Sequence, residues 1–122
     1  MTQEEGNKLI AVFDGWEVGR FEHLPNILHK MDNGKLWGID IDQMNYHEDW
    51  NKLMPVVEKI ENIRDDRGNY LFAVDIGRDY CTTYHNDFHT KTISVHSETH
   101  NKIISTWNAI TQFIQWYNTT KK

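Results

Sequence analysis

Three short segments in the second half of the chain have a period of two residues, and tight turns join them. The segments are residues 71–76, 80–84 and 92–96, with Gly77-Arg78-Asp79 and Asn86-Asp87 in the turns between them. Connections this short require antiparallel neighbours, so the pattern predicts a three-stranded antiparallel meander. A sheet this small needs helices on at least one face to be stable.

Three segments with helical periodicity can supply these helices. The first is predicted from about Gln3 to Phe13, where Gly15 stops it. The second is predicted from near Glu48 to near Ile63, and Pro55 fits there only if it lies near the first turn. The third is predicted from around Glu98–His100 to Tyr117, and it is the longest. The apolar stripes of the second and third helices contain Trp50, Leu53, Met54, Val57 and Ile60, and Ile103, Trp107, Ile110, Ile114 and Tyr117.

The predicted fold class is α+β, in the order helix, loop, helix, three strands, helix. We expect the layers to form either a two-layer fold or an α-β-α sandwich. The inward face of the sheet is predicted to carry Phe72, Val74, Ile76, Cys81, Ile93 and Val95. The opposite face carries Leu71, Ala73, Tyr80, Tyr84 and His96, which is less polar than a freely solvated face. Either a second copy of the chain covers this face, as a homodimer, or residues 14–45 or the first helix do so.

Residues 14–45 show no sustained period, and within them residues 36–42 are predicted as a short edge strand or an ordered loop. The chain has 122 residues and a mass of 14.5 kDa, which predicts one domain over residues 1–122.

Composition narrows the class of protein. The hydrophobic fraction of 39% is too high for a disordered chain, and the net charge of −5 has the wrong sign for broad nucleic-acid binding. The longest apolar run is residues 9–13, far short of the roughly 20 that a membrane-spanning helix needs. The first residues are acidic and polar, which predicts no secretory signal, and a lone cysteine, Cys81, suits a reducing compartment. We therefore expect a cytoplasmic protein without a membrane partner.

Three stretches of the sequence form recognisable motifs: residues 7–15, the run Tyr46-His47-x-x-Trp50-x-x-Leu53-Met54-Pro55 through Glu61, and the run Trp107-x-Ala109-Ile110-x-x-Phe113-Ile114-x-Trp116-Tyr117-Asn118. They resemble motifs of small proteins encoded by Bacteroidetes and their phages. The predicted order of helices and strands is also similar to that of the phage α-β-α sandwich domain family. The resemblance skips residues 16–45, and Asp14 stands where those proteins usually have methionine. The resemblance implies a similar fold and a phage or prophage context, and it carries over no functional residues.

Histidines are the first candidates for chemistry, because four of the seven lie between residues 85 and 100. A composite transition-metal site is possible where the second strand ends beside the start of the third, with candidate ligands His85, His89, His96 and His100. The alternative, which we favour, is that these are exposed polar or capping side chains. We expect no cofactor.

Aspartates and the cysteine are weaker candidates. Asp32, Asp40 and Asp42 have a spacing found in Mg²⁺ or Ca²⁺ sites, but the rest of a calcium loop is missing and turn capping is favoured. His47 precedes an acidic first turn, for which capping is also favoured over general-base catalysis. Cys81 is predicted as a buried thiol with a raised pKa, which argues against nucleophilic catalysis.

Tryptophans offer a binding surface. Trp16 and Trp37 lie in the irregular segment near Arg20, Lys30 and Lys35, where they can grip a partner or stack on a base. The alternative, which we favour, is that this segment folds back and buries them in a satellite core. Tyr80 and Tyr84 add two more aromatic candidates on the sheet.

Three functional classes follow from these candidates. The leading one is a non-catalytic accessory protein that binds a host protein. The second is a protein that binds or sequesters a small, nucleotide-like ligand through Trp16 and Trp37. The third is a metal-dependent enzyme that uses the histidine and aspartate clusters. No recognisable catalytic constellation is present, so we lean against an enzyme.

Overall fold

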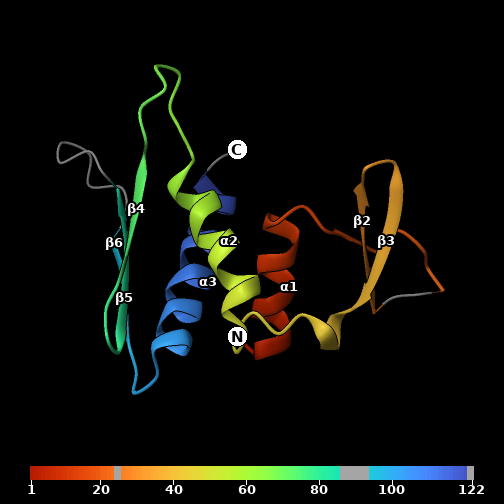
Figure 1. The fold of residues 1–122 in the computed structure, drawn as a ribbon, viewed down its shortest axis with the longest axis horizontal. Helices are drawn as coiled ribbons and strands as arrows, with labels where there is room; N and C mark the ends of the chain where they lie inside the picture. The colour runs from red at the N-terminus through yellow and green to blue at the C-terminus, as the bar shows by residue number, and fades with distance from the viewer. Residues whose placement is uncertain (24–25, 86–93, 121–122) are drawn as a thin grey trace.

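The computed structural model describes residues 1–23, 26–85 and 94–120 and shows an α+β fold (Figure 1). Its described part contains three α-helices and two three-stranded antiparallel sheets, of orders β1-β2-β3 and β4-β5-β6. The elements are α1 (Gln3–Phe13), β1 (Glu17–Val18), β2 (Ile27–Asp32), β3 (Lys35–Asp40), the short 3-10 helix η1 (Ile41–Gln43), α2 (Trp50–Glu61), β4 (Phe72–Ile76), β5 (Tyr80–His85), β6 (Ser94–Glu98) and α3 (Lys102–Thr120).

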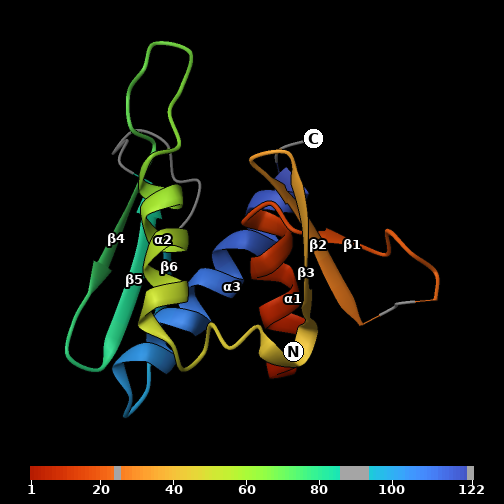
Figure 2. The same cartoon turned by 45° about the vertical axis from the view of Figure 1, so that its right-hand side comes forward.

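The helices form a layer between the two sheets, as both views show (Figures 1 and 2). Helices α2 and α3 pack against β4, β5 and β6, while α1 packs against α3 and lies nearer to β2 and β3. Leu28 of β2 is buried in the same core as Ile10 of α1 and Ile110 of α3. In the described part of the chain, one cluster of buried hydrophobic residues therefore reaches both sheets.

The predicted meander is confirmed. In it, Ile76 pairs with Cys81 and Thr83 pairs with Val95, both in antiparallel register. The inward face has the predicted residues: Phe72 and Cys81 are buried, and Val74, Ile76 and Val95 are partly buried. The predicted inward residue Ile93 lies outside the described residues.

The three predicted helices are present with small shifts at their ends. Helix α1 has the predicted bounds, and the reciprocal hydrogen bonds of Thr2 and Glu5 cap its start. Helix α2 begins at Trp50 because the Asp49 carboxylate accepts from the Asn51 N–H at the cap. Pro55 is its sixth residue, so the prediction that it lies near the first turn was wrong.

Helix α3 begins later than predicted. Glu98 is still in the sheet, where it pairs with Tyr80, so the helix cannot start there. The side chain of Asn101 then accepts from the backbone N–H groups of Ile103 and Ile104, which satisfies two donors at the helix start. The observed helix runs from Lys102 to Thr120, three residues beyond the predicted end.

The second sheet is formed within residues 14–45, the segment whose sequence shows no sustained period. Residues 36–40 belong to β3, which pairs with β2 along its whole length, and residues 41–43 form η1. A two-residue turn joins the strands, with both Asn33 (φ 52°) and Gly34 (φ 77°) in the left-handed region. This is the backbone of a type I′ hairpin, for which Asn-Gly is a preferred pair.

The second sheet also decides the layer order. Residues 14–23 and 26–45 lie across the helices from the meander and do not cover its outer face, so the α-β-α arrangement is not formed (Figures 1 and 2). Among the predicted outward residues, Tyr84 and His96 are exposed and Ala73 and Tyr80 are partly exposed. Leu71 was wrongly placed on that face, because it precedes β4 and packs against the core.

Candidate ligand-binding site

A groove of about 580 Å³ lies at the edge of the second sheet, beside the end of α1. Its lining is Trp16, Lys30, Asp32, Trp37, Gly38, Ile39 and Gln43. The strand register explains the grouping, because Lys30 pairs with Trp37 and Leu28 with Ile39, which places all four on one face. Leu28 on this face is buried in the hydrophobic core, so this face of the sheet packs toward the helices. The groove lies on the same face, beside the end of α1. Its volume lies within the range of small-molecule sites, roughly 300–1,000 Å³.

Trp16 is held at this position by the end of α1. The N–H of Asp14 donates to the Ile10 carbonyl, Gly15 turns the chain with a φ of 102°, and the N–H of Trp16 donates back to the Ala11 carbonyl. The indole is half-buried and packs against the core. Lys30 lies with its ammonium 5.5 Å from the centre of the Trp16 ring and donates to the Asp14 carbonyl at 3.1 Å. One wall of the groove is therefore fixed by contacts within the chain.

Trp37 is the other aromatic wall, and it is free to contact a ligand. It lies in β3 three residues after the hairpin turn, and 54% of its surface is exposed. An indole ring exposed to water has a large apolar area, and burying this area against a partner is favourable. The groove thus combines a fixed indole with an exposed one.

A smaller cavity of about 230 Å³ adjoins the groove, because Trp16, Lys30 and Ile39 line both. Its other lining residues are Asp14, Met44, Tyr46, Asn51, Lys52 and Pro55. The hydroxyl of Tyr46 donates to the Asp14 carboxylate at 3.4 Å, and burial together with this carboxylate raises the pKa of Tyr46 far above its usual value. The phenol therefore remains a neutral hydrogen-bond donor at any ordinary pH.

Lys52 is a further lining residue of this smaller cavity. Its ammonium donates to the Gln43 carbonyl at 2.8 Å and to the Asn45 side-chain oxygen at 2.7 Å. These bonds tie the start of α2 to the connection that follows η1. Gln43, Tyr46 and Lys52 were not found by sequence reasoning, since they join the site only through this connection.

Two of the five predicted binding residues, Trp16 and Trp37, come together in the groove. Arg20 lies apart from them, paired with Glu17 at 2.9 Å and 5.9 Å from the centre of the Phe21 ring. Tyr80 and Tyr84 are on β5 of the other sheet. The expected burial is correct only for Trp16, and it packs against the main hydrophobic core rather than in a satellite core, while Trp37 remains exposed.

The predicted metal ligands are not brought together where the structure describes them. His85 lies on the inward face of β5, edge-on to Phe72, whereas His96 lies on the outward face of β6, within 2.7 Å of the Thr82 hydroxyl and stacked on Tyr80. His100 is exposed beyond the end of β6, and His89 lies outside the described residues. Over residues 1–23, 26–85 and 94–120, no three His, Cys, Asp or Glu side chains are grouped to hold a metal ion.

The other candidates have structural roles in the described chain. The Asp40 carboxylate accepts from the Asp42 N–H at 2.9 Å and caps η1, which confirms the favoured interpretation. His47 contacts the side chain of Asn7 at 2.9 Å, while Asp49 caps α2. Cys81 is fully buried as predicted, and burial raises the pKa of its thiol to about 11.

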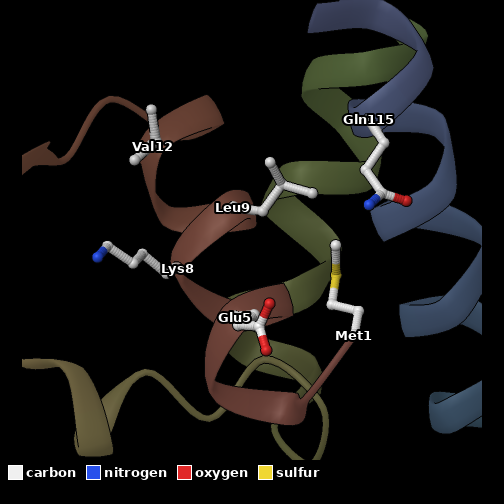
Figure 3. Close-up of a pocket in the computed structure, with 6 residues that line it drawn as sticks. All are labelled: Met1, Glu5, Lys8, Leu9, Val12 and Gln115. Atoms are coloured by element: carbon white, nitrogen blue, oxygen red, sulfur yellow. The ribbon is translucent and has the colours of Figure 1, made fainter.

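A second surface hollow, of about 340 Å³, lies between α1 and α3 (Figure 3). Figure 3 shows Met1, Leu9 and Gln115 turned toward the gap between the two helices, with Glu5, Lys8 and Val12 around them. Its surface is mostly apolar, although Glu5, Lys8 and Gln115 are among its lining residues. Unlike the tryptophan groove, it has no pair of aromatic side chains among its described lining residues.

Comparison with protein-family models, curated proteins and solved structures gave no significant match for this chain. Across the part of the chain that the structure covers, no helix is long and apolar enough to cross a bilayer.

Proposed function

We propose that this protein is a non-catalytic binding protein that holds a small ligand with a planar ring in the groove between Trp16 and Trp37. The observation that carries the proposal is the presence of two indoles in one concave site, one fixed and one 54% exposed. Aromatic walls with a few polar groups at the rim are the usual build of a small-ligand site. Lys30, Asp32 and Gln43 supply those polar groups here.

The interaction that we expect is stacking of the ligand ring on the indoles. Stacking of a nucleobase on an aromatic side chain contributes roughly 1–3 kcal/mol and tolerates any base, because every base has a π-face. A nucleoside is therefore a fair probe of the groove even before its natural ligand is known.

Isothermal titration calorimetry with adenosine tests the proposal. We expect saturable binding in the millimolar range or tighter, and the Trp37→Ala variant should bind about 5- to 150-fold more weakly, the ratio that corresponds to the loss of one stacking contact. Tyr84→Ala is the matched control, because Tyr84 is also an exposed aromatic residue but lies on the other sheet. The proposal fails if adenosine does not bind, or if both variants bind like the wild type.

A protein partner is the second candidate, and a separate observation favours it. Met31 and Leu36 face each other across the β2–β3 hairpin on the side opposite Trp37, and all three are exposed, at 57%, 42% and 54%. Exposed apolar side chains clustered at one end of a hairpin are typical of a contact surface. A Met31→Asp, Leu36→Asp double variant should lose a protein partner but keep adenosine, which separates the two functions.

The context of this function is also a proposal. The resemblance described above supports an accessory protein of a phage or prophage, and the single cysteine supports a cytoplasmic location. We further propose a homodimer in which a second copy covers the outer face of the β4–β5–β6 sheet. Its support is that residues 14–23 and 26–45 lie on the other side of the helices, so this described part of the chain does not cover that face.

A further inference from the structure

We infer that the ligand carries an anionic group beside its ring, and that Lys30 and Lys52 bind this group in the smaller cavity. The inference rests on the proposed function and names the class of ligand: a planar aromatic ring bearing a phosphate or carboxylate. The ring occupies the groove between Trp16 and Trp37, and the anion points inward past Lys30.

Lys30 is placed to contact a ligand in both spaces, because it lines the groove and the smaller cavity alike. Its ammonium donates one hydrogen bond, to the Asp14 backbone carbonyl, so two of its three N–H groups remain available. No carboxylate oxygen of the described residues lies within 4 Å of this ammonium. Its positive charge is thus held in place without being neutralised.

Lys52 presents a second such charge to the smaller cavity. Its two hydrogen bonds go to neutral oxygens, the Gln43 carbonyl and the Asn45 amide, and one N–H remains. Within the described chain it likewise has no carboxylate within 4 Å. Two ammonium groups with neutral partners on one small cavity favour an anion there, since charge-assisted hydrogen bonds are stronger than neutral ones.

Acidic side chains are outnumbered in the smaller cavity. Asp14 is the one carboxylate among its described lining residues, against the two ammonium groups, and it accepts from the Tyr46 hydroxyl at 3.4 Å. Asp32 lines the groove and not the smaller cavity, so it does not face the anion there. A cationic ligand would also meet the Lys30 ammonium, which already lies over the Trp16 ring. The arrangement therefore selects a ring with a negative group over a ring with a positive one.

The test compares three probes by calorimetry: adenosine (ring without anion), adenosine monophosphate (ring with anion) and ribose 5-phosphate (anion without ring). We expect the monophosphate to bind at least about tenfold more tightly than adenosine, which corresponds to one charge-assisted contact, and ribose 5-phosphate to bind more weakly than either. Because part of this advantage is electrostatic, it should shrink as sodium chloride is raised.

Lys30→Gln and Lys52→Gln should each reduce the affinity ratio of monophosphate to adenosine by at least about threefold. Adenosine affinity itself should change by less than about twofold in Lys52→Gln, because Lys52 lines the smaller cavity and not the groove. Lys59→Gln is the matched control for Lys30. Lys59 also donates to a backbone carbonyl, that of Phe13, and also lies over an aromatic ring, but it is outside both spaces. Thermal unfolding of each variant, compared with the wild type, shows that it is folded.

The outcomes separate the inference from the proposed function. Equal affinities for adenosine and its monophosphate, or ratios unaffected by both lysine variants, overturn the inference and leave the proposed function intact. Absence of binding by all probes contradicts both. Tight binding of ribose 5-phosphate without a contribution from the ring contradicts the proposed function.

Discussion

Gly6 lies directly under the indole ring of Trp107, although it is an interior residue of α1. A Cβ atom at this position would be only 2.2 Å from Trp107 Cζ2 and 3.2 Å from Thr111 Cγ2, so the close approach of α1 and α3 requires glycine. In an exposed helix the change from glycine to alanine stabilises by roughly 1 kcal/mol. In this protein the same substitution should be destabilising, because the added Cβ atom would clash with the Trp107 ring.

We expect Gly6→Ala to lower the free energy of unfolding by about 1–3 kcal/mol, the usual cost of overpacking a core. Urea denaturation measures it, with Lys8→Ala in the same helix as the control, because Lys8 is exposed. A stabilised Gly6→Ala protein would show that α1 and α3 do not approach this closely.

Asn7 connects the same tryptophan to His47. The indole N–H of Trp107 can only donate, and it donates to the Asn7 Oδ1 at 2.8 Å, so the Asn7 amide nitrogen must face His47 Nδ1 at 2.9 Å. His47 Nδ1 therefore accepts, and the proton of the neutral ring is on Nε2. This buried chain of hydrogen bonds fixes the relative positions of α1, α3 and the connection before α2.

Replacing Asn7 by leucine should cost about 1–3 kcal/mol of stability, because it leaves the buried indole N–H without an acceptor. The same urea measurement on Asn118→Leu is the control, since Asn118 is an exposed residue of α3. Equal stabilities of the two variants would contradict the role assigned to Asn7.

At the scale of elements, α3 is the central support of the fold. It packs against β5, β6, α1 and α2, and Ile110 at its middle is fully buried. Ile110→Ala should lower the free energy of unfolding by about 2–5 kcal/mol, as for other large buried side chains. Gln112→Ala, at an exposed position of the same helix, should have little effect. A cost for Ile110→Ala below that of Gln112→Ala would mean that the register of α3 is wrong.

Elements with a sustained period could be predicted from the sequence, and the second sheet could not. The stripes of α2 and α3 and the alternation in β4 and β5 have this regularity because one face of each element is buried. In β3, by contrast, the first four residues are all exposed, so no alternation marks the strand. The pair Asn33-Gly34 is a local signal for this sheet, because it is typical of a two-residue hairpin turn.

The candidate site could be predicted only in part. Tryptophans in an irregular, charged segment are recognisable as binding residues from their type alone. Their meeting in one groove depends on the pairing of Lys30 with Trp37 and on the turn at Gly15, which brings Trp16 back beside Lys30. These are contacts between distant parts of the chain, and no spacing in the sequence contains them.

At the scale of the whole molecule, we expect a homodimer that forms through the outer face of the β4–β5–β6 sheet. Tyr80 and His96 stack there with ring centres 5.7 Å apart, and Tyr84 is 38% exposed, so the face offers aromatic area to a second copy. Light scattering at micromolar concentration should give twice the chain mass of 14.5 kDa. Tyr84→Asp should restore the monomer mass. A wild-type mass of 14.5 kDa that does not change as the concentration rises would exclude the dimer.

The central claim is that a ligand ring lies between Trp16 and Trp37, and the indole N–H signals in a proton–nitrogen correlation spectrum test it most directly. The five tryptophans give five such signals, which single Trp→Phe variants assign. On titration with adenosine we expect the Trp16 and Trp37 signals to shift together, while the Trp107 signal stays fixed because its N–H is bonded to Asn7 inside the core. Shifts confined to Trp50, Trp107 or Trp116, or no shift at millimolar adenosine, would contradict the claim.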